Sequence, residues 1–358
     1  MTALPRWRSV ATRVDLLRST GPRHAWRRWQ CDRALRRVAP ARSAEVVRAL
    51  WTEAAAELGA TVTERGGGRL EIRRGHAVVT VAGQDASLNA PAAVALARDK
   101  PAAYAALTRA GVPVPEHLAF EAGDLEPAKA FLARGPVPCV VKPAAGSGGD
   151  GVTGGVRTAA DLRRAALSAA RFASRLLVER QIPGDVFRLL VLDGEVLDVL
   201  RRHAPQIEGD GRSTVEELIF AEYDRRLAAN GDGGLKPFAV DLDCLLALAS
   251  AGLSLRSVPP AGTVVPVKTV TNYNRRDENE AVGEAVAHGL KAQAAAAAAA
   301  LGLRLAGVDV VTPSTESGGT VVDVNAIPAL HHHGYVADHA AAARVAVPIL
   351  RTLLEDAR

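Results

Sequence analysis

The sequence is poor in aromatic residues and cysteine and has no long apolar run, and each shortage narrows what the protein can be. Aromatic residues make up 4% of the 358 residues, which leaves few of the stacking platforms that bind single-stranded nucleic acids. The three cysteines, Cys31, Cys139 and Cys244, match no metal or disulfide motif, so we expect reduced thiols. No apolar run approaches the ~20 residues of a membrane-spanning helix, and residues 1–10 lack the apolar core of a secretion signal. We therefore expect a cytoplasmic protein with no membrane partner.

Positive charge is concentrated near the N-terminus. Residues 1–46 hold eleven arginines and three acidic residues, so this segment carries more than the whole net charge of +5. A basic helical segment can bind nucleic acid, a membrane or an acidic substrate, although a solvated helix face in an arginine-rich protein is the simpler explanation. A nucleic-acid-associated protein stays an alternative, and it would bind DNA or RNA with a steep dependence on salt.

Lysine is rare enough for each one to be informative. Only six of the 44 lysines and arginines are lysines: Lys100, Lys129, Lys142, Lys236, Lys268 and Lys291. A sequence that uses arginine by default keeps lysine where a compact point charge is needed, as at phosphate sites. Lys129 and Lys291 fit helix surfaces, whereas Lys100, Lys142 and Lys268 are candidates for binding phosphate.

Hydrophobic spacing predicts a mixture of helices and strands. We expect helices up to about Gly59, two short strands at 69–74 and 76–83, one helix over 95–111, and a hairpin over 186–203 that turns at Asp193 and Gly194. Ser213 and Glu216 predict a capping box at the start of another helix. A long helix over about 277–301 and two strands at 305–312 and 319–327 complete the pattern.

Residues 140–156, VVKPAAGSGGDGVTGGV, carry the strongest local signal. Gly146, Gly148 and Gly151 match the spacing G-x-G-x-x-G, but a dinucleotide fingerprint must open a helix, and here the helix begins only after Thr158. The ending of a Walker loop is also absent. A strand, a glycine-rich turn and a second strand, with Lys142 closing the first strand, can instead fold over a triphosphate. A surface hairpin is the alternative, and a lysine in an apolar strand argues against it.

Three side chains with oxygen atoms that can bind a metal lie within two apolar strands near the C-terminus. Asp323 and Asn325 are two residues apart in VVDVN, so they share one face of a strand. Asp309 is a lone acid in the strand GVDVV. The alternative to a metal site is that these acids face water from strands at the edge of a sheet, which would explain either strand taken alone. Two such strands side by side can hold Mg²⁺, which takes few carboxylates and completes its octahedron with phosphate and water.

In their order along the chain, these segments resemble the ATP-grasp superfamily, most closely its cyanophycin synthetase-like and glutathione synthetase-like branch. The resemblance covers roughly residues 90–335 and rests on the segments ALARDKPAAYAALTRAGVPVPEH, VVKP with GSGGDGV, LVERQIPGDVFRLLVLDGEV, RRHAPQIEGDGRSTVEEL, VKTVTNYN, LAGVDVVTP and VVDVNAIPAL. It implies an α+β (α/β) fold of the ATP-grasp type. An N-terminal α/β domain with the basic helical segment would span 1–90, and two α+β subdomains, 91–182 and 183–358, would clamp ATP.

The resemblance also implies a role for each matching residue. The nucleotide would be bound by Lys100, Lys142, Gly146, Ser147, Gly148, Gly149, Gly151, Glu179, Gln181 and Ile182, with Asp185 in place of the usual ribose-binding acid. Arg188, Arg202, Lys268 and Asn272 would act in catalysis. Two Mg²⁺ ions would be held by Asp309, Asp323 and Asn325. A substrate carboxylate would be held by candidates among Arg275, Arg276, His331, His332 and His333, since arginine binds carboxylate bidentately.

Three departures from the family pattern concern metal and substrate. Asp323 replaces the usual glutamate, the usual glycine-rich turn after Asn272 is replaced by YNRRDEN, and Pro-Gly-Leu becomes PAL followed by His331–His333. The last two regions flank the acceptor site in the family, so we expect a different substrate. Zinc binding by the histidines is an alternative, but neighbouring residues on an extended loop point in alternating directions and no second cluster accompanies them.

The resemblance implies an ATP-dependent carboxylate–amine ligase. It would form an amide or peptide bond through an acyl phosphate, release ADP and phosphate, and act on an amino acid or small peptide, in bacterial specialised metabolism. A phosphotransferase that releases a phosphorylated product is one alternative, and an inactive nucleotide-binding module is another. The sequence leaves the substrates open, together with the choice between a monomer and a homo-oligomer.

Overall fold

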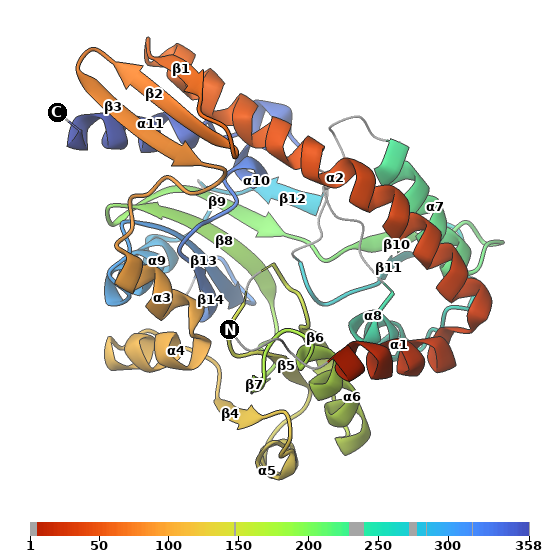
Figure 1. The fold of residues 1–358 in the computed structure, drawn as a ribbon. Helices are drawn as coiled ribbons and strands as arrows, with labels where there is room; N and C mark the ends of the chain where they lie inside the picture. Colours follow the sequence, from red (N-terminus) through yellow and green to blue (C-terminus); the bar gives the residue numbers. More distant parts are fainter. Residues whose placement is uncertain are drawn as a thin grey trace. The chain divides into compact units, whose positions relative to one another are not determined.

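The computed structural model describes residues 6–146, 148–228, 240–271, 278–283, 285–316 and 318–357. The chain forms two compact units, each assembled from three stretches of sequence (Figure 1). Unit 1 comprises Met1–Arg37, Pro115–Ile182 and Ala204–Asn274, and unit 2 comprises Val38–Val114, Pro183–His203 and Arg275–Arg358. Within the ranges described, every helix is too short or too polar to cross a membrane. The mixed helix and sheet content confirms the expected α+β class. The expected N-terminal domain, 1–90, and the two subdomains, 91–182 and 183–358, stay predictions.

The first half of unit 1 is an antiparallel four-stranded sheet backed by helices. Its strand order is β4-β7-β5-β6. The elements are β4 (His117–Glu121), α5 (Glu126–Arg134), β5 (Cys139–Pro143), β6 (Thr153–Val156), α6 (Ala159–Ala169) and β7 (Arg175–Arg180). Apolar residues of the sheet, such as Val141 and Val178, pack with Phe131 of α5 and Leu162 of α6 in one core. A capping box between Thr158 and Asp161 starts α6 where the sequence predicts it.

The second half of unit 1 surrounds a two-stranded sheet. It contains the first part of α2 (Pro22–Glu57), β10 (Gln206–Glu208), α7 (Val215–Ala228), α8 (Leu242–Ser250) and β11 (Val264–Pro266). Helix α1 (Arg6–Thr20) packs against α6 of the first half. Phe220 and Tyr223 of α7, Leu248 of α8 and Cys31 of α2 share a core. All three cysteines are buried and unpaired, as expected.

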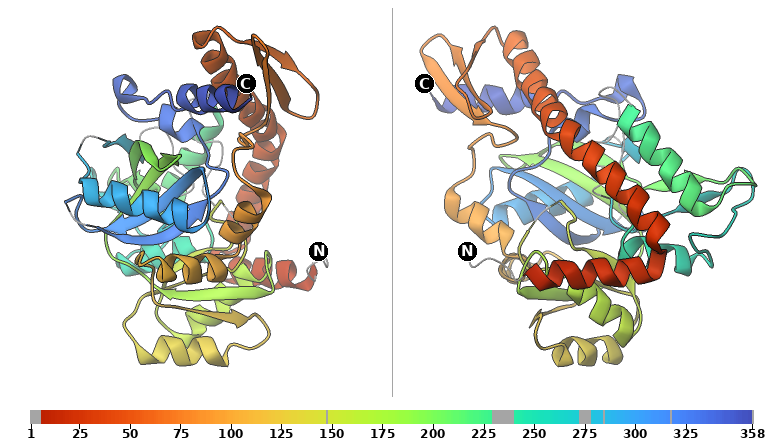
Figure 2. Two further views of the ribbon diagram at one scale, coloured as in Figure 1. Left: turned by 90° about the vertical axis from the view of Figure 1, so that its left-hand side faces the viewer. Right: turned by 45° about the vertical axis from the view of Figure 1, so that its right-hand side comes forward.

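Unit 2 is built on a five-stranded sheet of order β12-β9-β8-β13-β14. Its elements are α3 (Pro91–Arg98), α4 (Lys100–Arg109), β8 (Asp185–Leu192), β9 (Glu195–Arg202), β12 (Asn279–Ala281), α9 (His288–Ala300), β13 (Leu305–Thr312), β14 (Thr320–Asn325), α10 (His331–Gly334) and η2 (His339–Ala341). Helix α9 packs along the sheet (Figure 2). Its buried residues, from Leu290 to Ala298, are all apolar, so we infer that it covers the apolar face and leaves the other face for polar groups.

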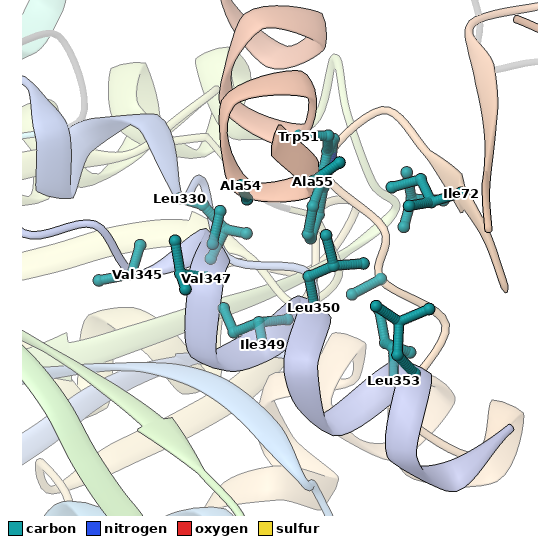
Figure 3. Packing of buried hydrophobic residues seen from close by; sticks show 14 of the residues in the cluster. Trp51, Ala54, Ala55, Ile72, Leu330, Val345, Val347, Ile349, Leu350 and Leu353 are labelled. Carbon is teal, nitrogen blue, oxygen red and sulfur yellow. The ribbon is translucent and has the colours of Figure 1, made fainter. Parts of the chain in front are cut away.

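A three-stranded sheet, a long helix and the last helix form a second core in unit 2 (Figure 3). The elements are β1 (Thr61–Glu64), β2 (Arg69–Arg74), β3 (Ala77–Ala82), the end of α2, and α11 (Ala346–Asp356). Trp51 of α2 and Ile72 of β2 are fully buried beside Leu350 of α11. Burying a large side chain contributes about 1.5–3 kcal/mol, so this core fixes the end of α2 against the sheet.

Most of the local predictions, including the last two strands, are confirmed, and three are wrong. The strands β2 and β3 form as expected, and β8 and β9 form the hairpin, whose turn uses the left-handed conformation of Asp193 and Gly194. The helix expected over 95–111 is interrupted at Asp99, whose side chain accepts a hydrogen bond from Ala102 N–H and so caps a new helix, α4. The capping box lies one residue later than expected, between Thr214 and Glu217.

The third wrong prediction is the helix over 277–301. Helix α9 begins only at His288, and Asn279–Ala281 form strand β12 at the edge of the sheet. Helical propensity favours a longer helix, but pairing with β9 satisfies the backbone of β12, and Asn279 also donates to the carbonyl oxygen of Tyr335 at 3.1 Å. Long-range hydrogen bonds therefore outweigh local propensity here.

Candidate active site

Lys142 is buried in unit 1 and paired with a buried carboxylate. Its Nζ donates to Glu179 Oε1 at 2.8 Å, across the adjacent strands β5 and β7. Both side chains are less than 8% exposed. A buried lysine needs such a partner, because an isolated ammonium in an apolar strand would lose its hydration without compensation. The pair therefore holds a positive charge at the end of β5, where the glycine-rich turn begins.

The glycine-rich turn joins β5 to β6 as a strand–turn–strand unit, as the sequence predicts. Gly146, Gly148, Gly149 and Gly151 all have φ values between 74° and 137°, a region that other residues rarely adopt. Gly151 is also packed tightly, since a Cβ there would lie 2.7 Å from the ring of Phe172. Glycine at these positions lets the backbone turn with its N–H groups available to an anion.

Lys268 is the third predicted lysine, and two acids surround it in unit 1. Its Nζ lies 2.7 Å from Asp241 Oδ1 and 3.4 Å from Asp243 Oδ2. Burial lowers the pKa of Lys268, but the two carboxylates outweigh burial and raise the pKa above its ordinary value. The ammonium therefore stays charged as part of a buried network.

Asp243 connects this network to the strand that follows the glycine-rich turn. Its carboxylate is fully buried and accepts hydrogen bonds from Gly154 N–H at 2.9 Å, Thr269 N–H at 3.0 Å and Thr269 Oγ1 at 2.5 Å. Gln181 Oε1 accepts from the next amide, Gly155 N–H, at 2.8 Å. Gly154 must be glycine, because a Cβ there would lie 2.3 Å from Thr269 Oγ1. Asp243 is not among the predicted site residues, although two acids spaced i, i+2, Asp241 and Asp243, mark the start of α8 in the sequence.

One face of the five-stranded sheet in unit 2 carries most of the other predicted residues. Residues opposite one another in antiparallel strands share a face, and so do residues two apart on one strand. Arg188 on β8 lies opposite Asp309 on β13, which lies opposite Asp323 on β14. Val186, two residues before Arg188, lies opposite Arg202 on β9. The register therefore brings both arginines and both acids onto one face, which we call the polar face.

Arg188 and Asp309 form a buried ion pair at the centre of the polar face. Arg188 Nε and Nη2 donate to the two carboxylate oxygens at 2.6 and 2.7 Å. Burial lowers the pKa of Arg188, but the charge and hydrogen bonds of Asp309 outweigh burial and raise it. Gly307 makes room for the arginine, because a Cβ there would lie 3.2 Å from Arg188 Cδ and 3.0 Å from Pro328 Cβ. The pair holds the Asp309 carboxylate in one orientation.

The remaining donors on the polar face fit a magnesium site. Asp323 contacts Lys100 at the start of α4, and its side chain is 24% exposed. Asn325 lies two residues further along β14, and its Nδ2 is 3.4 Å from Asp323 Oδ2, so its amide oxygen is the atom that can coordinate a cation. Two opposed carboxylates and an amide oxygen are hard ligands that suit Mg²⁺. The described ranges contain no group of three His, Cys, Asp or Glu side chains that could hold another metal.

Arg202 and the three histidines of α10 extend the polar face. Burial and the charge of Arg188 lower the pKa of Arg202 to about 10. His333 Nδ1 lies 2.5 Å from Asp198 Oδ2 on β9. Burial is the largest cause that lowers the pKa of each imidazole, and Arg202 adds to the shift in all three. The histidines are therefore neutral near pH 7.

Comparisons with known proteins decide the family. Residues 99–186 match the family described as "Carbamoyl-phosphate synthase L chain, ATP binding domain". A cyanophycin synthetase of Nostoc sp. is 35% identical over 257 residues, which are 67% of this chain and 27% of the relative. A glutathione biosynthesis bifunctional protein of Enterococcus faecalis is 29% identical over 242 residues, which are 64% of this chain and 32% of the relative. The chain belongs to the ATP-grasp superfamily.

A solved structure supports the same ATP-grasp fold. The bifunctional glutathione synthetase from Pasteurella multocida aligns over 87% of this chain and 44% of its own, with a TM-score of 0.56 and 23% sequence identity. This structure supports the fold, and the sequence relatives confirm the resemblance to the cyanophycin synthetase-like and glutathione synthetase-like branch. The chain spans about a quarter to a third of the length of these curated relatives.

Several predicted site residues of this ATP-grasp protein belong neither to the lysines and glycine-rich turn of unit 1 nor to the polar face of unit 2. Asp185 is exposed and ion-paired with Arg201 at 3.3 Å, and its position on β8 directs it to the face opposite Arg188. Ile182 is partly exposed at the end of unit 1. Ser147, Asn272, Arg275 and Arg276 lie outside the described residues. The roles assigned to the site residues stay predictions.

The basic N-terminal segment folds into helices α1 and α2, as expected. Arg28 is engaged within unit 1, where its Nη1 donates to the carbonyl oxygen of Val240 at 2.5 Å. Trp26 and Trp29 are 61% and 45% exposed, and their ring centroids lie 5.1 Å apart. Nucleic-acid binding by this segment stays an untested prediction, with salt-dependent binding to DNA or RNA as its measurement.

Asp243→Asn is expected to lower the free energy of unfolding by about 3 kcal/mol. The amide would present an NH₂ group to Gly154 N–H or Thr269 N–H, and Lys268 would lose one of its two partners. Urea denaturation followed by circular dichroism measures the change. Asp224→Asn is the matched control, because Asp224 is 67% exposed and forms a surface pair, so we expect a change within about 0.5 kcal/mol. Equal effects of the two substitutions would contradict the structural role of Asp243.

Proposed function

We propose that this protein is an ATP-dependent carboxylate–amine ligase that joins an amino acid or small peptide through an amide bond. The polar face carries the proposal: Asp309 and Asp323 lie opposite one another, each in contact with a cationic side chain. Such an arrangement suits Mg²⁺ and the phosphoryl group of ATP. The family resemblance supports the ligase chemistry, and the substrate region that departs from the family supports a place in bacterial specialised metabolism. The three buried, unpaired cysteines fit a cytoplasmic location.

In the proposed reaction, a carboxylate oxygen of the first substrate attacks the γ-phosphorus of ATP. The bond to the bridging oxygen breaks, and ADP leaves with that electron pair. The amine of the second substrate then attacks the acyl carbon, loses a proton and displaces inorganic phosphate. The protein needs to supply charge stabilisation and exclusion of water rather than a covalent group.

The described residues supply these functions in the proposal. Lys142 and Lys100 neutralise charge on the phosphoryl oxygens, and the backbone N–H groups of the glycine-rich turn bind the phosphates. Asp309, Asp323 and Asn325 would hold magnesium, which would supply Lewis-acid stabilisation of the phosphates. Arg188 orients Asp309 through two hydrogen bonds. Lys268, which lies between two acids, is a further cation of the proposed site.

Nucleotide turnover tests the proposal. The full-length protein is incubated with MgATP and pooled amino acids and dipeptides, and ADP with phosphate is resolved from AMP with pyrophosphate. We expect ADP release that requires both a carboxylate and an amine component. AMP release would contradict the acyl-phosphate route. ADP release with a single component and a stable phosphorylated product would indicate the phosphotransferase instead. ATP binding without turnover in any pool would favour an inactive nucleotide-binding module.

A further inference from the structure

Helices α1 and α6 lie side by side in unit 1 (Figure 1), and a groove lies between them and the segment that precedes α5. Its volume is about 420 Å³, which is within the range of small-molecule sites. Four residues of α1 spaced i, i+3, i+4 and i+7 line the groove, so one face of this helix forms its wall. The lining includes Val14, Arg18, Leu125, Arg163, Leu167 and Ala170.

The wall that α1 forms is held in place by Arg164 of α6. Arg164 Nε lies 3.1 and 3.0 Å from the two carboxylate oxygens of Asp15, and its Nη2 donates to Ser19 Oγ at 2.8 Å. One guanidinium thus contacts two residues of α1, so the groove is formed without a ligand. The ion pair also neutralises Asp15, which lines the groove.

Two further arginines add positive charge that is not balanced in this way. Arg18 on α1 and Arg163 on α6 line the groove and are exposed, so a ligand can reach both. Among the residues that the structure describes, neither has an acid as an ion-pair partner. Most of the other lining side chains are alanine, valine and leucine. An apolar groove with two available guanidinium groups suits a molecule with an apolar body and an anionic head group, since arginine binds carboxylate and phosphate through paired N–H donors.

This groove is separate from the proposed phosphate site. Val141 of β5 packs in one core with Leu162 of α6. Side chains alternate along a strand, so Lys142 points to the opposite face of the four-stranded sheet. A ligand in the groove is therefore separated from Lys142 by both α6 and the sheet.

The C-terminal end of α6 connects the groove to the glycine-rich turn. Ala170 lines the groove, whereas a Cβ on Gly151 would lie 3.1 Å from the Cα of Ala169. The two alanines are adjacent, so a ligand that fixes Ala170 also fixes the surface against which the turn packs. Ordering that surface in advance lowers the entropy cost of ordering the turn around a nucleotide.

We infer that the groove is an effector site: it binds a small molecule with an apolar body and an anionic head group, and its occupation strengthens nucleotide binding. Arg18 and Arg163 bind the head group, and Val14, Leu125 and Leu167 contact the apolar body. This inference goes beyond the proposed ligase reaction and rests on it only for nucleotide binding at the glycine-rich turn.

Methyl NMR of the full-length protein tests the site, with hexanoate as the probe. Hexanoate should shift the methyl resonances of Val14, Leu125 and Leu167. Acetate lacks the apolar body and hexan-1-ol lacks the charge, so each should bind at least about tenfold more weakly. Hexyl phosphate distinguishes the two head groups, because tighter binding than hexanoate assigns a phosphate ligand and weaker binding assigns a carboxylate. Absence of these shifts, or equal binding of hexanoate and hexan-1-ol, overturns the site.

Matched variants confirm where the head group binds. The double variant Arg18→Gln, Arg163→Gln changes two exposed side chains, so we expect it to fold, and it should bind hexanoate at least about tenfold more weakly than wild type. Arg134→Gln, at the exposed last turn of α5, is the control and should bind hexanoate like wild type. Wild-type affinity in the double variant overturns the assignment.

Calorimetric titration with ADP and Mg²⁺ tests the effector role. Saturating hexanoate should lower the Kd for ADP about fivefold in wild type, an effect of the size usual for coupled sites. The double variant should bind ADP like wild type without hexanoate and should show no response to it. An unchanged or raised Kd in wild type overturns the effector role. If wild type fails to bind ADP at all, nucleotide binding in the proposed function is wrong, and the methyl shifts still decide whether the groove is a binding site.

Discussion

Lys142→Ala should reduce ATP-dependent ADP release by at least about 100-fold, the loss typical of removing one preorganised group that stabilises charge in the transition state. In the proposed function, Lys142 is that group: its ammonium supplies the stabilising positive charge at the start of the glycine-rich turn. The measurement is kcat/KM for ATP at saturating Mg²⁺. Lys129→Ala is the matched control: Lys129 is also in unit 1, but it is 41% exposed and pairs with Glu126 at 2.7 Å on the surface of α5. We expect no change in turnover from the control.

A loss of stability could imitate this result, because Lys142→Ala leaves the Glu179 carboxylate buried without its ammonium. Breaking a buried pair by removing one partner costs about 3–5 kcal/mol. The double variant Lys142→Met, Glu179→Gln removes both charges and should recover most of the urea midpoint. Turnover should stay low in the double variant. If turnover recovers with the midpoint, Lys142 has a structural role only, and the phosphate-binding role is wrong.

The parts of the fold that the sequence predicted are those with local causes. The turn between β5 and β6 follows from glycines in left-handed conformations. The polar face follows from the period-2 alternation that places Asp323 and Asn325 on one side of β14. Each pattern involves residues only a few positions apart in the sequence. It could therefore be recognised without knowledge of distant contacts.

The parts that the sequence did not predict depend on distant contacts. The acids around Lys268 lie about 25 residues before it, Glu179 lies 37 residues after Lys142, and Asp15 lies 149 residues before Arg164. Strand β12 replaces the start of a predicted helix because β9 is available to pair with it. Neither the partners nor the pairing leaves a periodic signal in the sequence, although the two acids at the start of α8 could have marked Asp243 as a candidate.

Asp309→Asn is expected to lower turnover by at least about 100-fold and to raise the Mg²⁺ concentration required for half-maximal ADP release. The substitution removes one of the two opposed carboxylates, and metal ligation and phosphoryl stabilisation both depend on this charge. It also removes the partner of the buried Arg188, so we expect a stability loss of about 3–5 kcal/mol. Asp356→Asn, which alters an exposed pair with Arg304 in the same unit, should change neither quantity.

Asp323→Asn separates metal binding from folding. Asp323 lies opposite Asp309 on the polar face, but it is 24% exposed, so the stability cost should be clearly smaller than for Asp309→Asn. The Mg²⁺ requirement should nevertheless rise in both variants, because each removes one ligand of the same proposed site. A Mg²⁺ titration of ADP release, with circular dichroism to confirm that each variant is folded, gives the comparison. An unchanged Mg²⁺ requirement in folded Asp323→Asn would show that the two strands do not share a metal, and the polar face would then be an ion-pair network that serves the fold alone.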